Sequence, residues 1–421
     1  MQSNPTLRQS TATWCKIGLL SFGGPAAQIA LMHREIVENK KWLSEDQFLN
    51  ALNFCMLLPG PEAMQLATYS GWRINGILGG LIAGLLFVLP GAFLITLLAV
   101  IYAFFGDVPL INSLFLGVKA TVVVIVIQAL LKVSKKALKT HYHTSIAVTA
   151  FISIFFFNLP YPFIIFVSAF FGYLMLPNKI NVKQVQQSQP LTKTLKTILA
   201  WLVVWWIPIL LVYLISDQKI LTEITIFFSK LAVVTFGGAY AVLSYMAQDV
   251  VITKDWLTAG QMMDGLGLAE TTPGPLILVT EFVGFLAAFQ EGGIKLALIA
   301  GFLTLWVTFI PCFLWIFAGA PYIDWISSQP RLHGALSAIT AAVVGVILNL
   351  SIWFMLHVFF EKISDVQFGP INLLWPNFSY INVPAIFLTS ISIWLIIRLK
   401  WNIASVLLIN ASLALLQSLI N

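Results

Sequence analysis

Residues 58–62 read Leu-Pro-Gly-Pro-Glu, and residues 272–276 read Thr-Pro-Gly-Pro-Leu. A proline inside a helix removes a backbone donor and clashes with the preceding turn, whereas glycine lets the chain turn and lets backbone amides approach a ligand. Each Pro-Gly-Pro triplet therefore predicts a broken helix. The two triplets lie 214 positions apart.

The same offset relates other residues of the two halves. Lys16, Ser21, Phe22, Gly23 and Gly24 correspond to Lys230, Thr235, Phe236, Gly237 and Gly238, and Lys-Lys-Trp-Leu at 40–43 corresponds to Lys-Asp-Trp-Leu at 254–257. Self-similarity at one offset predicts a duplicated architecture. We expect a first repeat over residues 1–177, a polar linker plus one extra helix over 178–222, and a second repeat over 223–421.

The composition indicates a membrane protein, because 59% of the residues are hydrophobic and 10% are charged. Apolar runs at 77–105 and 110–131 exceed the roughly 20 residues that a helix needs to cross a bilayer. These runs are continuous and do not alternate with polar residues, which excludes a transmembrane β-barrel. The predicted fold class is an all-α polytopic membrane protein, and the polar N-terminus indicates no removable signal peptide.

The two repeats are predicted to have inverted topology. We expect six apolar segments in each half and one more at 197–215, and an odd number of crossings before the second repeat inverts it. The positive-inside rule places the strongest basic cluster in the cytoplasm, namely Lys132, Lys135, Lys136 and Lys139. This predicts about 13 crossings of the inner (plasma) membrane, with a cytoplasmic N-terminus and an external C-terminus. In an alternative, the interrupted first two segments of each half are re-entrant, which leaves Arg34, Lys40 and Lys41 inside.

The chain shows no pattern typical of a metal or cofactor site. Its three cysteines and five histidines lack metal-ligand spacing, so we expect no metal and no cofactor. No basic stretch indicates a nucleic-acid partner. A membrane-embedded enzyme would need clustered catalytic carboxylates or a motif such as His-Glu-x-x-His, which the sequence lacks. We therefore expect a transport protein rather than an enzyme; a passive anion channel is the alternative within that class.

Broken helices in inverted repeats are typical of secondary transporters, which bind substrate at the breaks. A helix that starts at a break carries about half a positive charge and up to four unpaired amides, which suits an anion. The alternative is that the breaks only shape helix packing. The breaks are at Pro25, Pro59, Pro61, Pro273 and Pro275. The candidate substrate-binding residues beside them are Ser21, Gly23, Gly24, Gln28, Gly60, Gln65, Thr235, Gly237, Gly238, Thr271, Thr272 and Gly274.

Lys16 and Lys230 are further substrate-binding candidates. Each precedes its Gly-Gly pair by about two helical turns, or roughly 10 Å. Two interpretations are open: the lysines attract an anion into a central cavity, or their ammonium groups reach out to the membrane surface.

Four carboxylates lie within apolar stretches and are candidates for proton coupling or gating: Glu62, Asp264, Glu270 and Glu281. Protonation of a buried carboxylate would alternately admit and repel an anion. The alternatives are salt bridges with lysines or positions at the membrane interface.

The motifs at 21–28, 41–42 and 58–69 resemble the first-half signature of the chromate transporter (CHR) family. Those at 229–240 and 269–275 resemble its second half, so the chain is similar to the long, two-domain members. Strict internal symmetry fails at two positions, where Ala239 replaces Pro25 and Leu276 replaces Glu62.

The resemblance implies secondary-active export of chromate, as by an antiporter, and chromate resistance. It also implies energy from the proton gradient or the membrane potential. The expected partners are the chromate anion, its competitor sulfate and the lipid bilayer. A carrier of sulfate or of another tetrahedral oxyanion is the alternative, and the oligomeric state, a homodimer included, is left open.

Overall fold

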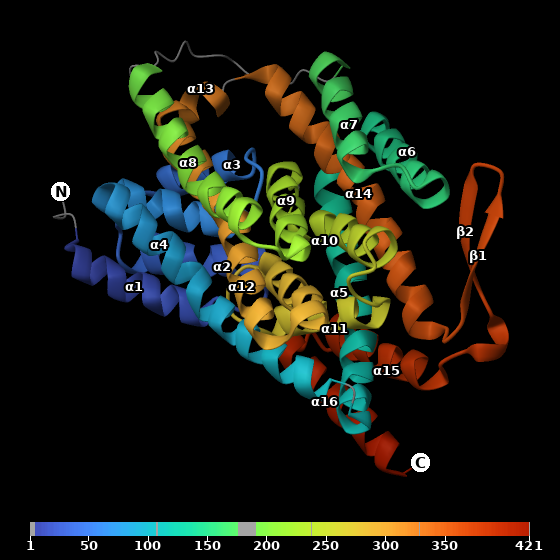
Figure 1. The fold of residues 1–421 in the computed structure, drawn as a ribbon. Coiled ribbons are helices and arrows are strands. Elements are labelled where there is room, and N and C mark those ends of the chain that lie inside the picture. Colours follow the sequence, from blue (N-terminus) through green and yellow to red (C-terminus); the bar gives the residue numbers. More distant parts are fainter. Residues whose placement is uncertain (1–4, 107, 176–190, 237, 328, 421) are drawn as a thin grey trace. The chain divides into compact units, whose positions relative to one another are not determined.

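The computed structural model describes residues 5–106, 108–175, 191–236, 238–327 and 329–420 (Figure 1). The chain forms two compact units, each of which contains segments of both sequence halves. Unit 1 comprises Met1–Val100, Lys179–Ala239 and Thr272–Pro330, and unit 2 comprises Ile101–Asn178, Tyr240–Thr271 and Arg331–Asn421. Most of the predicted linker, residues 178–190, lies outside the described residues.

Helices make up unit 1. They are α1 (Leu7–Leu20), α2 (Gly24–His33), the π-helix η1 (Arg34–Asn39), α3 (Glu45–Cys55), most of α4 (Glu62–Phe105), α8 (Leu191–Ile215), α9 (Lys219–Val234), the 3-10 helix η3 (Leu276–Leu278), α12 (Val279–Gly319), η4 (Ala320–Tyr322) and α13 (Ile323–Ser327).

Unit 2 contains helices and one β-hairpin. Its elements are α5 (Pro109–Ala137), α6 (His141–Phe157), α7 (Tyr161–Met175), α10 (Ala239–Gln248), the π-helix η2 (Asp249–Thr253), α11 (Ala259–Thr271), α14 (Pro330–Phe359), β1 (Ile363–Phe368), β2 (Ile371–Pro376), η5 (Phe378–Tyr380), α15 (Val383–Ile393), the π-helix η6 (Trp394–Arg398) and α16 (Ile403–Ile420). Helices α15 and α16 pack against α5 (Figure 1).

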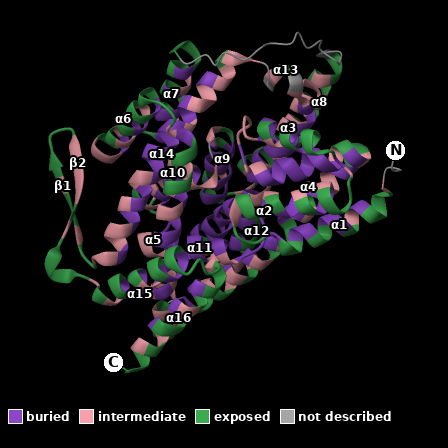
Figure 2. Ribbon diagram, turned by 180° about the vertical axis from the view of Figure 1, so that it is seen from behind, coloured by how far each residue is buried: buried purple, intermediate pink, exposed green. Residues whose placement is uncertain are grey.

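The described part of the chain is a multi-pass membrane protein. Six helical segments are long and apolar enough to cross a bilayer, and they involve α4, α5, α8, α12, α14 and α16. The shorter α6, α7, α10 and α15 are also apolar. Figure 2 shows buried residues concentrated in α12, whereas α8 exposes much of its apolar surface. An exposed apolar surface of this extent fits contact with lipid.

Helices α4 and α12 each fold back on themselves at an interior glycine. In α4 the fold is at Asn75 and Gly76, whose φ is 67°. A Cβ added to Gly71 would lie 2.3 Å from the carbonyl oxygen of Gly79. Eight residues of straight helix would span about 12 Å. Each element is therefore two antiparallel helices, and in α12 the fold is at residues 292–293, where φ of the second glycine is 69°.

Local backbone geometry recurs at the offset seen in the sequence. Both η1 and η2 are π-helices, and the residues that follow them, Lys41 and Asp255, have φ of 52° and 51°. Non-glycine residues seldom adopt positive φ, so the coincidence has structural weight. The two halves therefore share backbone conformation as well as sequence.

The β-hairpin departs from the all-α expectation. Strands β1 and β2 pair antiparallel, and Phe368 and Ile371 form the last pair before the Gly369-Pro370 turn. Gly369 has a φ of 60°, which glycine adopts readily and which a tight hairpin turn requires. The all-α expectation included no strand, and these two strands are the departure from it among the described residues.

Candidate functional site

The helix breaks of the two halves are joined by a reciprocal pair of backbone hydrogen bonds. The amide of Gly60 donates to the carbonyl oxygen of Thr235 at 2.8 Å, and the amide of Gly274 donates to the carbonyl oxygen of Ser21 at 2.9 Å. Both donors and both acceptors are related by the offset of 214. All four residues belong to unit 1.

The first break lies at the turn of a helical hairpin formed by α1 and α2. Lys16 and Glu35 are 19 residues apart, yet their side-chain atoms Nζ and Oε1 are 2.8 Å apart. A straight helix would separate the two residues by about 28 Å. The chain therefore turns back at Phe22-Gly23, and we call residues 21–24 the first tip.

The second break lies at the turn of another hairpin, formed by α3 and the start of α4. The rings of Phe54 and Tyr69 have centroids 6.5 Å apart. Fifteen residues of straight helix would place them about 22 Å apart. Pro59, Gly60 and Pro61 therefore form a second tip, residues 58–61.

Side-chain hydroxyls stabilise the tips in a symmetric way. Ser21 donates its hydroxyl to the carbonyl oxygen of Ile17 at 2.6 Å, and Thr235 donates to that of Leu231 at 2.5 Å. These bonds occupy carbonyls that the ending helices leave without an amide partner. The predicted residues Ser21 and Thr235 thus contact the tips through backbone and side chain.

Two predicted glutamines bind the tips through their amide groups. Gln28 donates to the carbonyl oxygen of Gly274 at 2.6 Å and to that of Ser21 at 3.3 Å, so it connects the breaks of both halves. Gln65 donates to the carbonyl oxygen of Pro59 at 2.6 Å. Both glutamines are fully buried. Their geometry holds the tips in place.

The back of the second-half Pro-Gly-Pro triplet is tightly packed. A Cβ added to Gly91 of α4 would lie 2.1 Å from the carbonyl oxygen of Pro273. Gly60 has a φ of 116°, and a Cβ there would lie 3.1 Å from Cys312 Sγ. Neither position has room for a side chain, which fixes the tips against α4 and α12.

The front of the first tip is open. A Cβ added to Gly24 meets no atom within 4 Å, and the same holds for Gly238 at the corresponding second-half break. Helix α2 begins at Gly24 with Gly23 as its N-cap in a left-handed conformation, and no side chain caps its amides. The start of α2 thus has no side-chain cap and has open space beside Gly24, and a helix start of this kind is a candidate anion site. Pro25 lies in the first turn of α2, and Gly237 lies outside the described residues.

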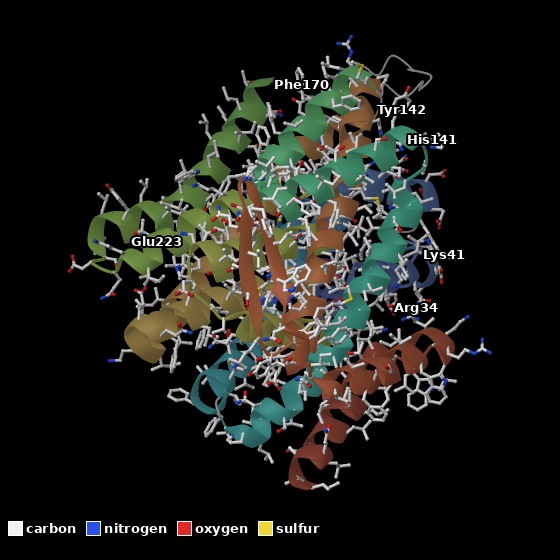
Figure 3. The ribbon with its side chains drawn as sticks, turned by 90° about the vertical axis from the view of Figure 1, so that its right-hand side faces the viewer. Arg34, Lys41, His141, Tyr142, Phe170 and Glu223 are labelled. Carbon is white, nitrogen blue, oxygen red and sulfur yellow. The ribbon has the colours of Figure 1, made fainter. Side chains whose placement is uncertain are left out.

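Neither predicted lysine has an ammonium group bound to a tip. Lys16 is 55% exposed and pairs with Glu35, which is buried. Together with Lys40 and Trp42 they line a shallow pocket. Lys230 is exposed on α9. Nearby, Arg34 at the start of η1 and Lys41 in the turn after η1 are exposed and point outward (Figure 3).

The candidate carboxylates have different partners. In unit 1, Glu281 is 1% exposed and accepts a hydrogen bond of 2.5 Å from the Thr96 hydroxyl. Glu62 is half-buried in the first turn of α4, beside the second tip. Thr272, Pro273 and Pro275 are buried in the second-half break.

In unit 2, Asp264 accepts a hydrogen bond from Tyr102 at 2.8 Å and pairs with Lys119 at 3.2 Å, so it is the salt bridge that the sequence left as an alternative. Glu270 accepts from Tyr240 at 2.7 Å. Thr271 donates its hydroxyl within its own helix, to Leu268.

Lys119 was missed by the sequence analysis. It lies inside the run 110–131, which we treated as uniformly apolar. Ionisable residues within membrane segments are rare and are functional candidates by default, so the signal was present in the sequence.

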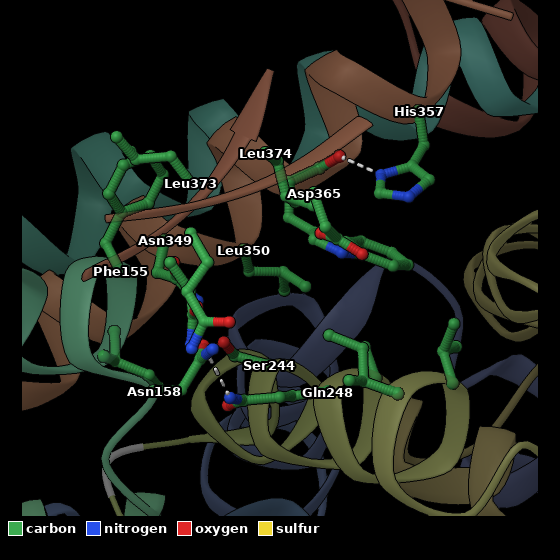
Figure 4. Close-up of a pocket in the computed structure, with 17 residues that line it drawn as sticks. Phe155, Asn158, Ser244, Gln248, Asn349, Leu350, His357, Asp365, Leu373 and Leu374 are labelled. Atoms are coloured by element: carbon green, nitrogen blue, oxygen red, sulfur yellow. Dashed lines mark hydrogen bonds between the residues drawn. The ribbon is translucent and has the colours of Figure 1, made fainter. Parts of the chain in front are cut away.

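A pocket of about 450 Å³ in unit 2 lies between the β-hairpin and the ends of α6, α10 and α14 (Figure 4). Asn158 and Gln248 are hydrogen-bonded across it at 3.5 Å. Its lining includes His357 and the carboxylate of Asp365 but, among the described residues, no lysine or arginine. Its charge therefore does not favour a dianion.

Comparison with known proteins identifies the family. The family described as chromate transporter matches residues 8–173 and 222–416. A chromate transport protein of Pseudomonas aeruginosa is 31% identical over 349 residues, which cover 80% of this chain and 79% of that protein. A probable chromate transport protein of Synechococcus elongatus is 29% identical over 344 residues, which cover 81% of this chain and 83% of that protein.

A shorter relative matches only part of the chain. An uncharacterized transporter of Bacillus subtilis, YwrA, is 32% identical over 162 residues, which cover 38% of this chain but 91% of that protein. No solved structure matches. Because the family match covers most of the sequence, the chain belongs to the chromate transporter family.

Proposed function

We propose that this protein is a secondary-active carrier that exports chromate from the cytoplasm and confers chromate resistance. The observation that carries the proposal is the reciprocal pair of hydrogen bonds Gly60–Thr235 and Gly274–Ser21, which joins helix breaks of both repeats beside uncapped amides. The choice of chromate as the substrate rests on relatives that are named chromate transport proteins.

The tips suit a small tetrahedral dianion. Backbone amides and the partial positive charge at the start of α2 attract negative charge without a basic side chain. A membrane carrier gains from contacts that do not bind too tightly, because the anion must leave the site as well as enter it. The prolines have no amide of their own, and the amides of Gly60 and Gly274 are occupied by the reciprocal bonds, so the donors proposed for the anion are those in the first turn of α2.

Charge and contacts favour nine crossings over the expected count of about 13. The fold-back of α1 on α2 supports a re-entrant hairpin, which leaves Arg34 and Lys41 in the cytoplasm, as the positive-inside rule favours. The contact between Asn158 and Gln248 supports the same arrangement for α9 and α10, because 13 crossings would put these two residues on opposite membrane faces. The proposed crossings are residues 77–105, α5, α6 and α7, then α8, then residues 294–319, α14, α15 and α16.

Four crossings plus α8 still make an odd number before the second repeat. The halves therefore remain inverted, with a cytoplasmic N-terminus and an external C-terminus. Arg398 at the end of η6 and the basic end of α5 then both face the cytoplasm. This agreement supports the inverted orientation.

The membrane potential favours export. A potential of about 100 mV, negative inside, is worth about 2.3 kcal/mol per charge and hence about 4.6 kcal/mol for a dianion leaving the cell. Uptake of the same anion would have to overcome this energy.

Among the four candidate carboxylates, Glu281 is the one we assign to proton coupling. The hydroxyl of Thr96 has one proton but makes two hydrogen bonds, to Glu281 at 2.5 Å and to the carbonyl oxygen of Ala92 at 3.0 Å. Both bonds form together when the carboxyl group carries a proton and donates to Thr96. The second carboxyl oxygen of Glu281 is buried and has no hydrogen-bond partner among the described residues.

The charged residues of α8 and α9, which pack against α12, do not neutralise a negative charge on Glu281, because they are exposed. They are Lys193, Lys196, Lys219, Glu223 and Lys230. A buried carboxyl group in this setting is neutral unless a partner arrives. Glu281 follows the second-half Pro-Gly-Pro triplet by one to two turns, so its ionisation would repel an anion at the tips.

Transport into everted membrane vesicles tests this function. The cytoplasmic face of the membrane is on the outside of such vesicles, so a protein that exports chromate from the cell carries it into the vesicle. Chromate uptake is measured with a membrane potential and a pH gradient imposed separately. The proposal expects chromate accumulation that depends on one or both gradients. Accumulation of sulfate without chromate would support the alternative of a sulfate or other oxyanion carrier, since amide donors recognise charge and shape rather than the central atom. Equal flux without any gradient would support a passive channel.

A further inference from the structure

Helix α5 carries a charged pair in the middle of its apolar length. Lys119 Nζ lies 3.2 Å from an oxygen of Asp264 on α11. Along α5, Lys119 is about 15 Å from Pro109 at one end and about 20 Å from Lys132 near the other. Both distances along α5 exceed the reach of a lysine side chain, and the partner that the ammonium group finds is Asp264 on α11.

A charged pair within the membrane is an energetically unfavourable way to hold two helices together. A lysine at the centre of a membrane helix costs about 2.5 to 3.5 kcal/mol on insertion scales. Replacing buried ion pairs by apolar side chains of similar volume is often neutral or stabilising. Stability alone therefore does not account for Lys119.

The two partners are not held equally. Asp264 is 3% exposed and its other oxygen accepts a hydrogen bond from Tyr102 at 2.8 Å, whereas Lys119 is 20% exposed. A Cβ added to Gly260 would lie 3.4 Å from Nζ, so a side chain at that position would contact the ammonium group. Tyr102 can keep Asp264 in place while Lys119 turns to another anion.

We propose that Lys119 binds the transported tetrahedral oxyanion and that Asp264 is its resident counter-ion in the empty carrier. This rests on the proposed function and assigns to unit 2 a residue that contacts the same anion. An arriving dianion replaces the carboxylate as the partner of the ammonium group. When the anion is released, the ion pair between Lys119 and Asp264 forms again. The carboxylate thereby weakens binding enough for turnover.

Among the described residues, Asp264 forms its ion pair with Lys119. The other acidic group of α11, Glu270, is held by Tyr240, and α16, which also packs on α11, has no charged residue. Lys119 is thus the charged partner on which Asp264 relies among the described residues of these helices.

Initial rates of chromate transport in proteoliposomes test the assignment. We expect Lys119→Ala to raise KM about tenfold or more, and Lys119→Arg to stay within about threefold of wild type because it keeps the charge. We expect Asp264→Asn to lower KM and to slow turnover, because the anion then has no competitor. Lys362→Ala is the matched control: this exposed lysine of the same unit stacks on Tyr380, and its loss should leave KM unchanged.

A double variant separates binding from folding. Lys119→Met with Asp264→Leu removes both charges, so the protein should melt within a few degrees of wild type and still show the KM of Lys119→Ala. A wild-type KM in this double variant, or in Lys119→Ala, overturns the assignment. If wild type moves neither chromate nor sulfate, the proposed function fails and the inference falls with it. Calorimetric titration with sulfate should show the same order of affinities.

Discussion

The amide of Gly60 donates to the carbonyl oxygen of Thr235, and the amide of Gly274 donates to that of Ser21. Gly274 corresponds to Gly60, and Thr235 to Ser21, at the offset of 214. Each repeat therefore supplies one donor and one acceptor to the other. A change in either bond alters the position of both helix breaks, so the pair is a natural point at which a carrier changes state.

Alanine at Gly60 or Gly274 should impair sulfate binding. Their φ values are 116° and 92°, which an L-residue adopts only with strain. We expect each variant to weaken binding at least tenfold in calorimetric titration of the purified protein. Gly369→Ala is the control, because it imposes similar strain in the hairpin turn, where φ is 60°, and should leave binding unchanged. Equal losses in all three variants would show a general folding defect instead.

Glu281→Gln should remove the proton dependence of transport. Glutamine imitates the protonated carboxyl group, which the geometry with Thr96 favours. In wild type, raising the pH deprotonates Glu281 and places a negative charge near the anion, so KM should rise with pH. In the variant KM should stay constant between about pH 6 and pH 8 at a fixed potential, because glutamine has no proton to gain or lose. If the pH dependence of KM in the variant equals that of wild type, a residue other than Glu281 couples transport to protons.

Lys16→Ala should act through long-range attraction. The ammonium group is exposed and paired with Glu35, so its contribution to stability is about 0–1 kcal/mol. We expect a KM about threefold higher at low salt, with kcat unchanged, and an effect that disappears at high ionic strength because exposed charges are screened. A loss of kcat that salt does not alter would place Lys16 in direct contact with the anion.

Cysteine labelling should distinguish nine crossings from about 13. In a Cys15→Ser background, Lys40→Cys should react with a membrane-impermeant maleimide from the cytoplasmic side, and Asp255→Cys should react from the outside. The other two native cysteines, Cys55 and Cys312, are buried and should stay silent. Labelling of Lys40→Cys from the outside and of Asp255→Cys from the cytoplasmic side would support 13 crossings instead.

The sequence predicted the breaks well, because proline and glycine act locally. The chain turns at both triplets, where Gly60 and Gly274 have positive φ, and the shared offset reappears in the backbone at Lys41 and Asp255. The family resemblance was also confirmed.

The paths of the helices were harder to predict. The apolar run that begins at residue 77 marks the fold at Asn75 and Gly76, but hydropathy does not show whether the shorter segment before it crosses the membrane or is re-entrant. Lys119 was missed because its apolar neighbours dominate any window of about 20 residues. The partners of Asp264 and Glu281 depend on tertiary contacts that no local pattern specifies.

The central claim is that the joined breaks carry a tetrahedral dianion outward. Chromate flux through oriented proteoliposomes, driven by an imposed potential at equal pH, measures this directly in wild type and in Gly274→Ala. We expect wild type to move chromate toward the positive side, sulfate to compete, and the variant to lose at least nine-tenths of the rate. Wild-type flux in a correctly folded Gly274→Ala protein would contradict the account.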